Sequence, residues 1–254
     1  MIAAIRPRVA PVTTTSPMTV PLLLLGTGAA AVLVDLPAAS VVPVGGLLLW
    51  GVREAGCRST ARRVCGHAST LIALTFVLAV STPVLLPAAV DQLVLAGFAA
   101  IALAAVLASS PSARAALRPR RPEPGDLAWL VGGFGTALPV GVAVMPLGAR
   151  ATVLELSAIT ALVVLVPALY ELLYRGLLMH VAGVSRQGVV LVALAQGLAT
   201  VPLFGWWGLL AGTLLGAAFG YVRVGGGWQA SLCAHWGVAF GLAAPVLMGA
   251  GVIA

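Results

Sequence analysis

The chain has few charged residues and lacks two polar residue types altogether. Lysine and asparagine are absent from its 254 residues, and charged residues make up only 8% of the total, against roughly 25% in soluble domains. Hydrophobic residues make up 61%, which is more apolar surface than a water-soluble fold can bury. We therefore exclude a soluble globular protein and expect most of the chain to lie in a lipid bilayer.

Cysteine is also scarce, with three residues at positions 57, 65 and 233. An odd number of cysteines cannot pair completely within one chain, and no two of these form a CxxC motif. The spacing argues against a disulfide framework and against a structural zinc site. Cys57 and Cys65 flank a cluster of arginines, and we expect them to face a reducing cytoplasm.

Acidic residues are outnumbered, with seven against 14 arginines and a formal net charge of +7. A basic chain can indicate nucleic-acid binding, but these arginines gather in two short polar gaps between apolar stretches, without interleaved aromatics. The two clusters are Arg53, Arg58, Arg62, Arg63 and Arg114, Arg118, Arg120, Arg121. Such gaps are typical of the cytoplasmic loops of membrane proteins, and we expect no nucleic-acid partner.

Nine stretches are candidate membrane spans, since a helix needs about 20 mostly apolar residues to cross a bilayer. They are 19–35, 38–52, 68–88, 91–109, 127–147, 152–183, 188–204, 206–223 and 228–252. The stretch 38–52 is short, and a re-entrant segment there would leave eight spans. The predicted fold is an all-α, polytopic transmembrane helical bundle of eight or nine spans.

The distribution of arginine predicts the orientation of this bundle. With nine spans and a cytoplasmic N-terminus, both arginine clusters, Arg186 and Arg223 fall at cytoplasmic ends, and only Arg150 of the 14 arginines falls outside. This agrees with the positive-inside rule. We expect a multi-pass protein of the cell membrane with its N-terminus in the cytoplasm and its C-terminus on the other side.

The segment RPRRPEPGD, 118–126, is the clearest linker in the chain, because it is rich in proline and charge. With the apolar stretches on either side, it predicts four regions along the chain. These are a cytoplasmic N-terminal tail at 1–18, N-terminal transmembrane helices at 19–109, a cytoplasmic Arg/Pro-rich linker at 110–126, and a C-terminal transmembrane core at 127–254.

A few ionisable residues fall inside the apolar stretches, where each needs a partner or a function. Glu171 and Arg175 stand four residues apart with the acid first, the favoured order for an ion pair on one helix face. Such a pair alone would hold the helix in the bundle interior. His180 is expected on roughly the opposite face. His235 lies in the last span, and Glu155 is a further candidate.

Two segments resemble signatures of the CPBP family, the CAAX-protease and bacteriocin-processing-like intramembrane metalloproteases. YELLYRGLL, 170–178, is similar to the family's E-E-x-x-x-R motif. GAAFGYVRVGGGWQASLCAHWGVA, 216–239, is similar to its last signatures, with matches at Tyr221, Arg223, Gly225, Trp228 and His235. The resemblance covers about residues 150–245 and implies a CPBP-like core in the C-terminal part of the chain.

The resemblance implies metal-assisted peptide hydrolysis, with Glu171 and His235 as metal ligands and Arg175 orienting Glu171 or binding a substrate carboxylate. Three motif positions differ from the family. Tyr170 replaces the first glutamate, Thr200 replaces the histidine of F-x-x-x-H, and Ala239 replaces the last asparagine or aspartate. A catalytic metal site needs about three protein ligands, and a threonine hydroxyl is a poor one.

We therefore expect a degenerate CPBP homologue with weak or no peptidase activity, acting as a membrane binding or scaffold protein. One alternative is an active intramembrane metallo-endopeptidase that uses Glu171, Arg175 and His235. Another is a transporter or lipid-handling protein whose Glu171–Arg175 pair lines a polar path. The expected partner is the lipid bilayer. A divalent metal such as zinc, and a membrane-proximal peptide or protein substrate, are expected only for an active protease.

Overall fold

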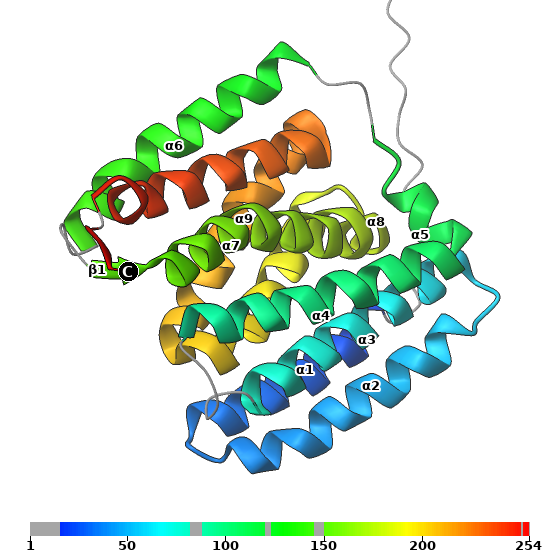
Figure 1. Cartoon of the computed structure of the whole chain (residues 1–254). Coiled ribbons are helices and arrows are strands. Elements are labelled where there is room, and N and C mark those ends of the chain that lie inside the picture. The colour runs from blue at the N-terminus through cyan, green and yellow to red at the C-terminus, as the bar shows by residue number, and fades with distance from the viewer. Residues whose placement is uncertain (1–15, 82–87, 120–122, 145–149, 250, 254) are drawn as a thin grey trace, which may run out of the picture.

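The computed structural model describes residues 16–81, 88–119, 123–144, 150–249 and 251–253. These residues are almost entirely helical (Figure 1). Apart from turns and connections, the described residues also contain a short parallel pairing between β1 (Arg150–Thr152) and β2 (Gly251–Ile253). The all-α class predicted from the sequence is thereby confirmed.

The N-terminal half consists of antiparallel helices joined by short connections. They are α1 (Thr19–Leu33), the 3-10 helix η1 (Pro37–Ser40), α2 (Val41–Ala55), α3 (Thr60–Ser81) and α4 (Ala88–Ser109). The helix α2 is continuous and packs along α3. The stretch for which a re-entrant segment was an alternative therefore contains one unbroken helix.

The C-terminal half begins within the region predicted as a linker, where residues 111–116 form a short helix. Its elements are α5 (Pro111–Ala116), α6 (Pro124–Val144), α7 (Val153–Tyr170), the π-helix η2 (Glu171–Leu178), α8 (Met179–Ala182) and α9 (Arg186–Gly249). The two halves form one bundle, because α1 and α3 pack against α9, and α4 packs against α7.

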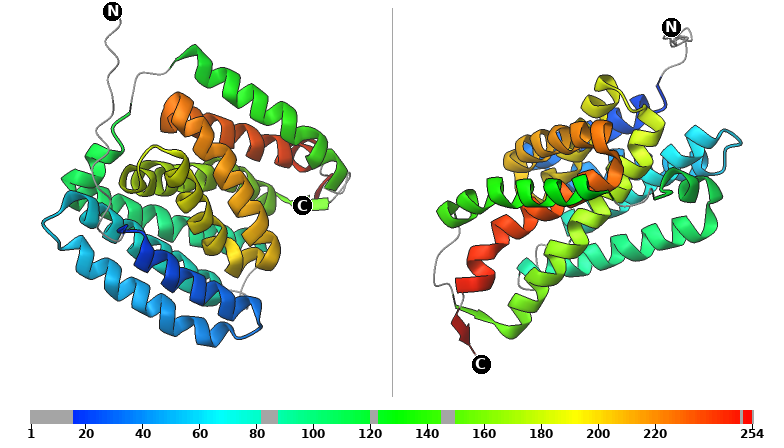
Figure 2. Two further views of the ribbon diagram at one scale, coloured as in Figure 1. Left: turned by 180° about the vertical axis from the view of Figure 1, so that it is seen from behind. Right: turned by 90° about the horizontal axis from the view of Figure 1, so that it is seen from above.

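The long element α9 is three helical segments, because its backbone leaves the helical conformation at two glycines. Gly205 has φ 57° and Gly227 has φ 85°, values that glycine adopts at little steric cost. The segments 186–204, 206–226 and 228–249 therefore fold back on one another, as Figure 2 shows. Their three passes coincide with three of the spans predicted from the sequence.

Five helices among the described residues are long and apolar enough to cross a membrane. They are Thr60–Val80, Gln92–Ser109, Pro124–Ala143, Val153–Ala182 and Arg186–Gly249. The helix α1, with 15 residues, is apolar but shorter. The chain is thus a multi-pass membrane protein. Each of the nine predicted spans overlaps a helical segment, but the ranges 19–35 and 152–183 run slightly past the helix ends, and 228–252 runs into β2.

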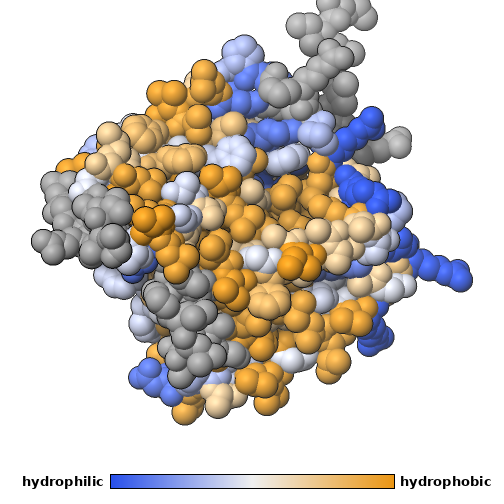
Figure 3. All heavy atoms as spheres, in the orientation of Figure 1, coloured by the Kyte–Doolittle hydropathy of each residue, from blue (hydrophilic) through white to orange (hydrophobic). Residues whose placement is uncertain are grey.

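The surface fits a bilayer around the bundle. Hydrophobic residues cover most of the face seen in Figure 3, and hydrophilic residues gather at the end formed by α5 and the α2–α3 connection. Large apolar side chains point outward, including Val42, which is 80% exposed, and Trp207, which is 73% exposed. Exposed apolar area on this scale is stable where the solvent is hydrocarbon.

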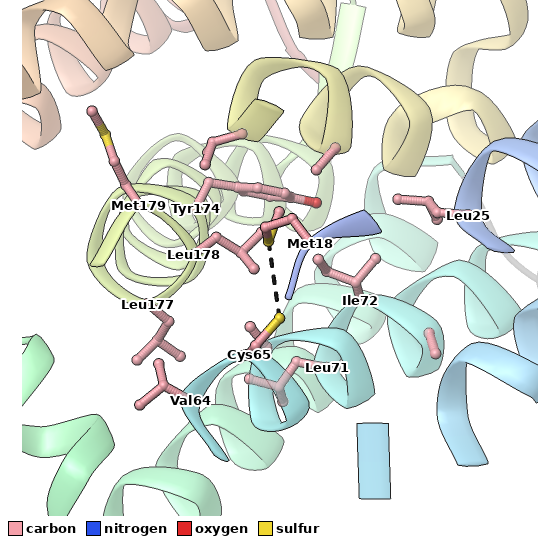
Figure 4. Close-up of a cluster of buried hydrophobic side chains, with 14 of the residues drawn as sticks. Met18, Leu25, Val64, Cys65, Leu71, Ile72, Tyr174, Leu177, Leu178 and Met179 are labelled. Atoms are coloured by element: carbon pink, nitrogen blue, oxygen red, sulfur yellow. Dashed lines mark hydrogen bonds between the residues drawn. The ribbon is translucent and has the colours of Figure 1, made fainter. Parts of the chain in front are cut away.

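A cluster of buried apolar side chains joins the N-terminal helices to η2. Met18, Leu71 and Ile72 pack near Leu177 and Leu178 (Figure 4). Cys65 belongs to this cluster, and its Sγ lies 3.9 Å from Met18 Sδ. Cys65 is therefore buried, and the expectation that it faces the cytoplasm is wrong. The third helix begins at Thr60, so this position already lies one turn inside it.

Candidate polar site in the C-terminal half

The polar residues predicted from the motifs converge on one buried cluster. Glu171 and Arg175 lie on η2, and His235 lies on the third segment of α9. The first and second segments of α9 complete the surroundings with Gln196 and Phe219. Residues from two regions about 60 positions apart in the sequence therefore form one site.

The helix changes register where the site begins. Pro167 lies inside α7 and has no N–H to donate to the preceding turn. The indole of Trp236 donates a hydrogen bond to the nearby carbonyl of Val164 at 2.9 Å. From Glu171 to Leu178 the chain is then a π-helix, a wider helix that occurs frequently at functional sites.

Glu171 is completely buried, and both of its carboxylate oxygens have partners within the chain. Ser231 Oγ lies 2.5 Å from Oε2, and His235 Nδ1 lies 3.0 Å from Oε1. The Ser231 hydroxyl also lies 2.9 Å from the carbonyl oxygen of Phe219. Since a hydroxyl has one hydrogen to donate, these two acceptors share it.

Arg175 is also completely buried, and its hydrogen bonds go to the α9 segments rather than to Glu171. Nη1 donates to Gln196 Oε1, and Nη2 donates to the carbonyl oxygen of Gly216 at 2.6 Å. Its Nε lies 3.8 Å from Glu171 Oε1 and makes no hydrogen bond within the described part of the chain. The predicted ion pair is present, but only as this long contact.

Competing partners explain why the pair is loose. The Arg175 guanidinium donates two hydrogen bonds to the α9 segments, and both carboxylate oxygens of Glu171 have partners on the last α9 segment. The pairing expected along one helix face therefore gives way to partners on a neighbouring element. His180 is exposed, as expected for a residue on another face from Glu171.

His235 is held by rings on two sides. Its imidazole stacks on Phe219 with 4.3 Å between ring centroids, and the Tyr170 ring meets it edge-on at 6.2 Å. The side chain is 13% exposed. When Glu171 is ionised it can only accept, so Nδ1 carries a proton, and in the neutral imidazole Nε2 then carries the lone pair. Nε2 has no hydrogen-bond partner among the described residues.

None of the three positions that differ from the family motifs supplies a metal ligand to the cluster. Thr200 Oγ1 lies within hydrogen-bond distance of three backbone carbonyl oxygens, with Gly208 nearest at 2.8 Å. Tyr170 packs on Tyr174 at 5.4 Å between ring centroids. Ala239 offers no polar atom. Glu155 lies outside the site, because it closes a capping box with Thr152 at the start of α7.

The predicted metal ligands do not fit a catalytic metal site as they are placed. Glu171 and His235 meet, but they hydrogen-bond to each other. Within the described ranges, no group of three or more His, Cys, Asp and Glu side chains is arranged to hold a metal ion. A catalytic zinc needs about three protein ligands and an open position, and this cluster supplies at most one outward-facing nitrogen.

Sequence reasoning missed three residues of the cluster. Ser231 was not singled out, although it precedes His235 by four residues and therefore shares its helix face. Gln196 carries a signal of its own, because an amide inside an apolar span needs a partner. Phe219 gave no signal in the sequence, because an aromatic residue in a membrane helix is common.

Close helix packing brings the Arg175 partners within reach. A Cβ placed on Gly216 would lie 2.9 Å from Ala193 Cα, and one on Gly220 would lie 2.8 Å from Val189 Cγ1. The first two segments of α9 therefore contact each other almost backbone to backbone, as small residues permit in membrane helices. This proximity places the Gly216 carbonyl and the Gln196 amide beside one guanidinium group.

Comparison of the chain with protein-family models, with curated proteins and with solved structures finds no match. The similarity to the CPBP family therefore rests on the motif residues quoted from the sequence. The structure adds the placement of those residues, which brings both motif segments into one cluster. Family membership is accordingly a proposal.

Proposed function

We propose that this chain is an integral membrane protein of the CPBP type with weak or no peptidase activity, which acts by binding other molecules in the membrane. The observation that carries the proposal is the state of Glu171. Its side chain is 0% exposed, and Ser231 and His235 occupy its two oxygens. A carboxylate enclosed in this way has no access to the water that a hydrolase must activate.

The convergence of the motif residues supports the CPBP part of the proposal. Arg223, from the second motif segment, donates through Nε to the backbone carbonyl of Arg175 at 3.3 Å. His235, from the same segment, pairs with Glu171 at 3.0 Å. Both contacts join the first motif segment to the second.

The geometry also explains how the cluster persists without catalysis. Arg175 has 0% exposure and its positive charge has no route to water. Removing Glu171 would leave that charge without a counter-ion, and unpaired buried charges destabilise a protein strongly. The residues are therefore retained as a polar network that fixes the packing of η2 on the three segments of α9.

A second candidate, the active metallo-endopeptidase, is favoured by one observation. A histidine that donates one ring N–H to a carboxylate presents its other nitrogen as a more basic ligand. His235 has this arrangement toward Glu171, with Nε2 on the side away from the carboxylate. The candidate needs two further ligands from outside this cluster, and a metal would have to bind at His235.

The membrane orientation belongs to the same proposal. The α2–α3 connection, α5 and the α8–α9 connection lie at one end of the bundle, at the right of Figure 1. Five exposed arginines lie in these segments or within three residues of them, namely Arg58, Arg62, Arg114, Arg118 and Arg186. We place this end in the cytoplasm of a cell membrane, which puts the C-terminal end of the chain on the opposite side.

The deciding experiment measures the metal content and peptidase activity of the purified full-length protein. Wild type, His235→Ala and the matched control His180→Ala are each analysed by mass spectrometry, before and after zinc is added back. We expect no stoichiometric metal and no cleavage of a peptide library in any of the three. About one bound metal per chain that is lost only in His235→Ala would reject the proposal and favour the peptidase.

A further inference from the structure

A separate cavity of about 140 Å³ lies where α3, α4, α7, η2 and α9 meet. Ala79 of α3, Ala96 of α4, Leu173 of η2 and Ala199 of α9 contribute to its wall. Three of these side chains are alanines, which leave space between helices that larger residues would fill. The cavity is not part of the Glu171 cluster, although Tyr170 borders both.

The cavity opens toward the outer surface of the bundle. Leu203 and Phe204 line it, and they are 37% and 53% exposed. Both lie at the end of the first α9 segment, which belongs to a candidate membrane span. An exposed apolar surface on such a span faces lipid hydrocarbon, so the mouth of the cavity faces the acyl chains of the bilayer.

The lining favours an apolar occupant. Its polar groups are the hydroxyls of Thr75, Tyr170 and Tyr174 and the amide of Gln92. The Thr75 hydroxyl is engaged with backbone carbonyls of its own helix, at 2.9 Å and 3.1 Å. The remaining wall is hydrocarbon. Apolar cavities exclude water but bind apolar molecules, because an empty cavity forfeits dispersion contacts.

The size selects the kind of occupant. An engineered cavity of about 150 Å³ holds one benzene molecule, and this one is similar in volume at about 140 Å³. A complete lipid does not fit. The terminal carbons of one chain fit, provided that the rest of the molecule stays in the bilayer beside the exposed lining residues Leu203 and Phe204.

We propose that this cavity binds the end of one acyl chain of a membrane phospholipid. The chain enters from the bilayer past Phe204 and ends against Leu173 and Tyr174. The inference depends on the membrane setting and on the cavity, and it holds whether or not the Glu171 cluster is of the CPBP type. Because Tyr170 lines the cavity and contacts His235 edge-on, the bound chain lies next to the polar cluster.

The test uses the full-length protein in nanodiscs that contain a phospholipid with a diazirine near the end of one acyl chain. After illumination, the labelled residues are mapped by mass spectrometry of peptides. Labelling is expected at Tyr174 and Ala96, which are 3% and 6% exposed. Ordinary contact with the bilayer labels only outward residues such as Leu214, which is 62% exposed.

Two filling variants and one control make the result specific. Ala96→Phe fills the cavity from α4, and Ala99→Phe narrows it from the same helix. Ala104→Phe adds the same ring to an exposed position of α4. Loss of labelling at Tyr174 in Ala96→Phe and Ala99→Phe, with retention in Ala104→Phe, supports the proposal. Circular dichroism and gel filtration identify any variant that does not fold.

The wild-type result alone is able to overturn the inference. Labelling confined to outward residues shows that no phospholipid chain enters. Labelling of Tyr174 that persists in both folded filling variants shows that the reagent reaches it by another route. Labelling of enclosed residues by a free diazirine fatty acid, but not by the phospholipid, assigns the cavity to a different ligand.

Discussion

His235 Nδ1 lies 3.0 Å from Glu171 Oε1, although 64 residues separate the two positions in the chain. The contact joins the π-helix η2 to the last segment of α9, with the two other α9 segments between them in the sequence. A carboxylate and an imidazole meet here inside apolar surroundings. The polar network around this contact is therefore the feature on which both stability and any chemistry of the site depend.

Glu171→Ala is expected to destabilise the protein even if it has no enzymatic role. Arg175 keeps its hydrogen bonds to Gln196 and Gly216 but loses the one acidic partner that the described residues give it, and breaking a buried pair costs about 3–5 kcal/mol. The measurement is thermal unfolding in detergent. Glu155→Ala, which removes only a capping carboxylate, is the comparison and should cost about 1 kcal/mol.

The double variant Glu171→Ala/Arg175→Met checks the reason for that loss. Replacing both members of a buried pair by apolar residues is often close to neutral. We expect the double variant to unfold at a higher temperature than Glu171→Ala alone. An equal or lower unfolding temperature would show that the charge of Arg175 is not what makes the single variant unstable.

Ser231→Ala is expected to lower stability by about 1–3 kcal/mol, because it leaves a buried carboxylate oxygen without its donor. The hydroxyl lies 2.5 Å from Glu171 Oε2, and alanine keeps the helical backbone. Ser157→Ala, at an exposed position of α7, makes the same chemical change outside the cluster. Indistinguishable unfolding of the two variants would argue against the Ser231–Glu171 hydrogen bond.

Gly216→Ala is expected to separate the first two segments of α9. The added Cβ would lie 2.9 Å from Ala193 Cα, and backbone atoms cannot move aside as a side chain does. Overpacking of this kind typically costs about 1–3 kcal/mol. Gly225→Ala meets no atom within 4 Å and is the matched substitution. Thermal unfolding should distinguish the two variants. Equal unfolding temperatures would mean that the two segments are packed less tightly than the distance between Gly216 and Ala193 implies.

The orientation is tested with cysteine labelling in intact cells. A cysteine introduced at exposed Ser59, in the α2–α3 connection, should react with a membrane-permeant reagent only. One introduced at Asp35, between α1 and η1, should also react with an impermeant reagent, because that connection lies at the opposite end from the exposed arginines. Both measurements are made in a background without the three native cysteines, and the reverse pattern would invert the proposed orientation.

The sequence by itself determined the solvent and the elements of this protein. Membrane helices satisfy their own backbone hydrogen bonds, so a long apolar run is enough to predict each of them, and the predicted stretches fall on helices. The cost of burying charge likewise identified Glu171, Arg175 and His235 as residues that need partners. These conclusions follow from composition and from neighbours within one or two helical turns.

Only the tertiary structure decided which residues are the partners of Glu171, Arg175 and His235. The sequence predicts that Arg175 pairs with Glu171, but its guanidinium donates to Gln196 and Gly216, because close packing at Gly216 brings two α9 segments beside it. Ser231 reaches Glu171 across 60 residues. Contacts of this kind depend on how chain reversals at Gly205 and Gly227 stack three segments, which no local periodicity encodes.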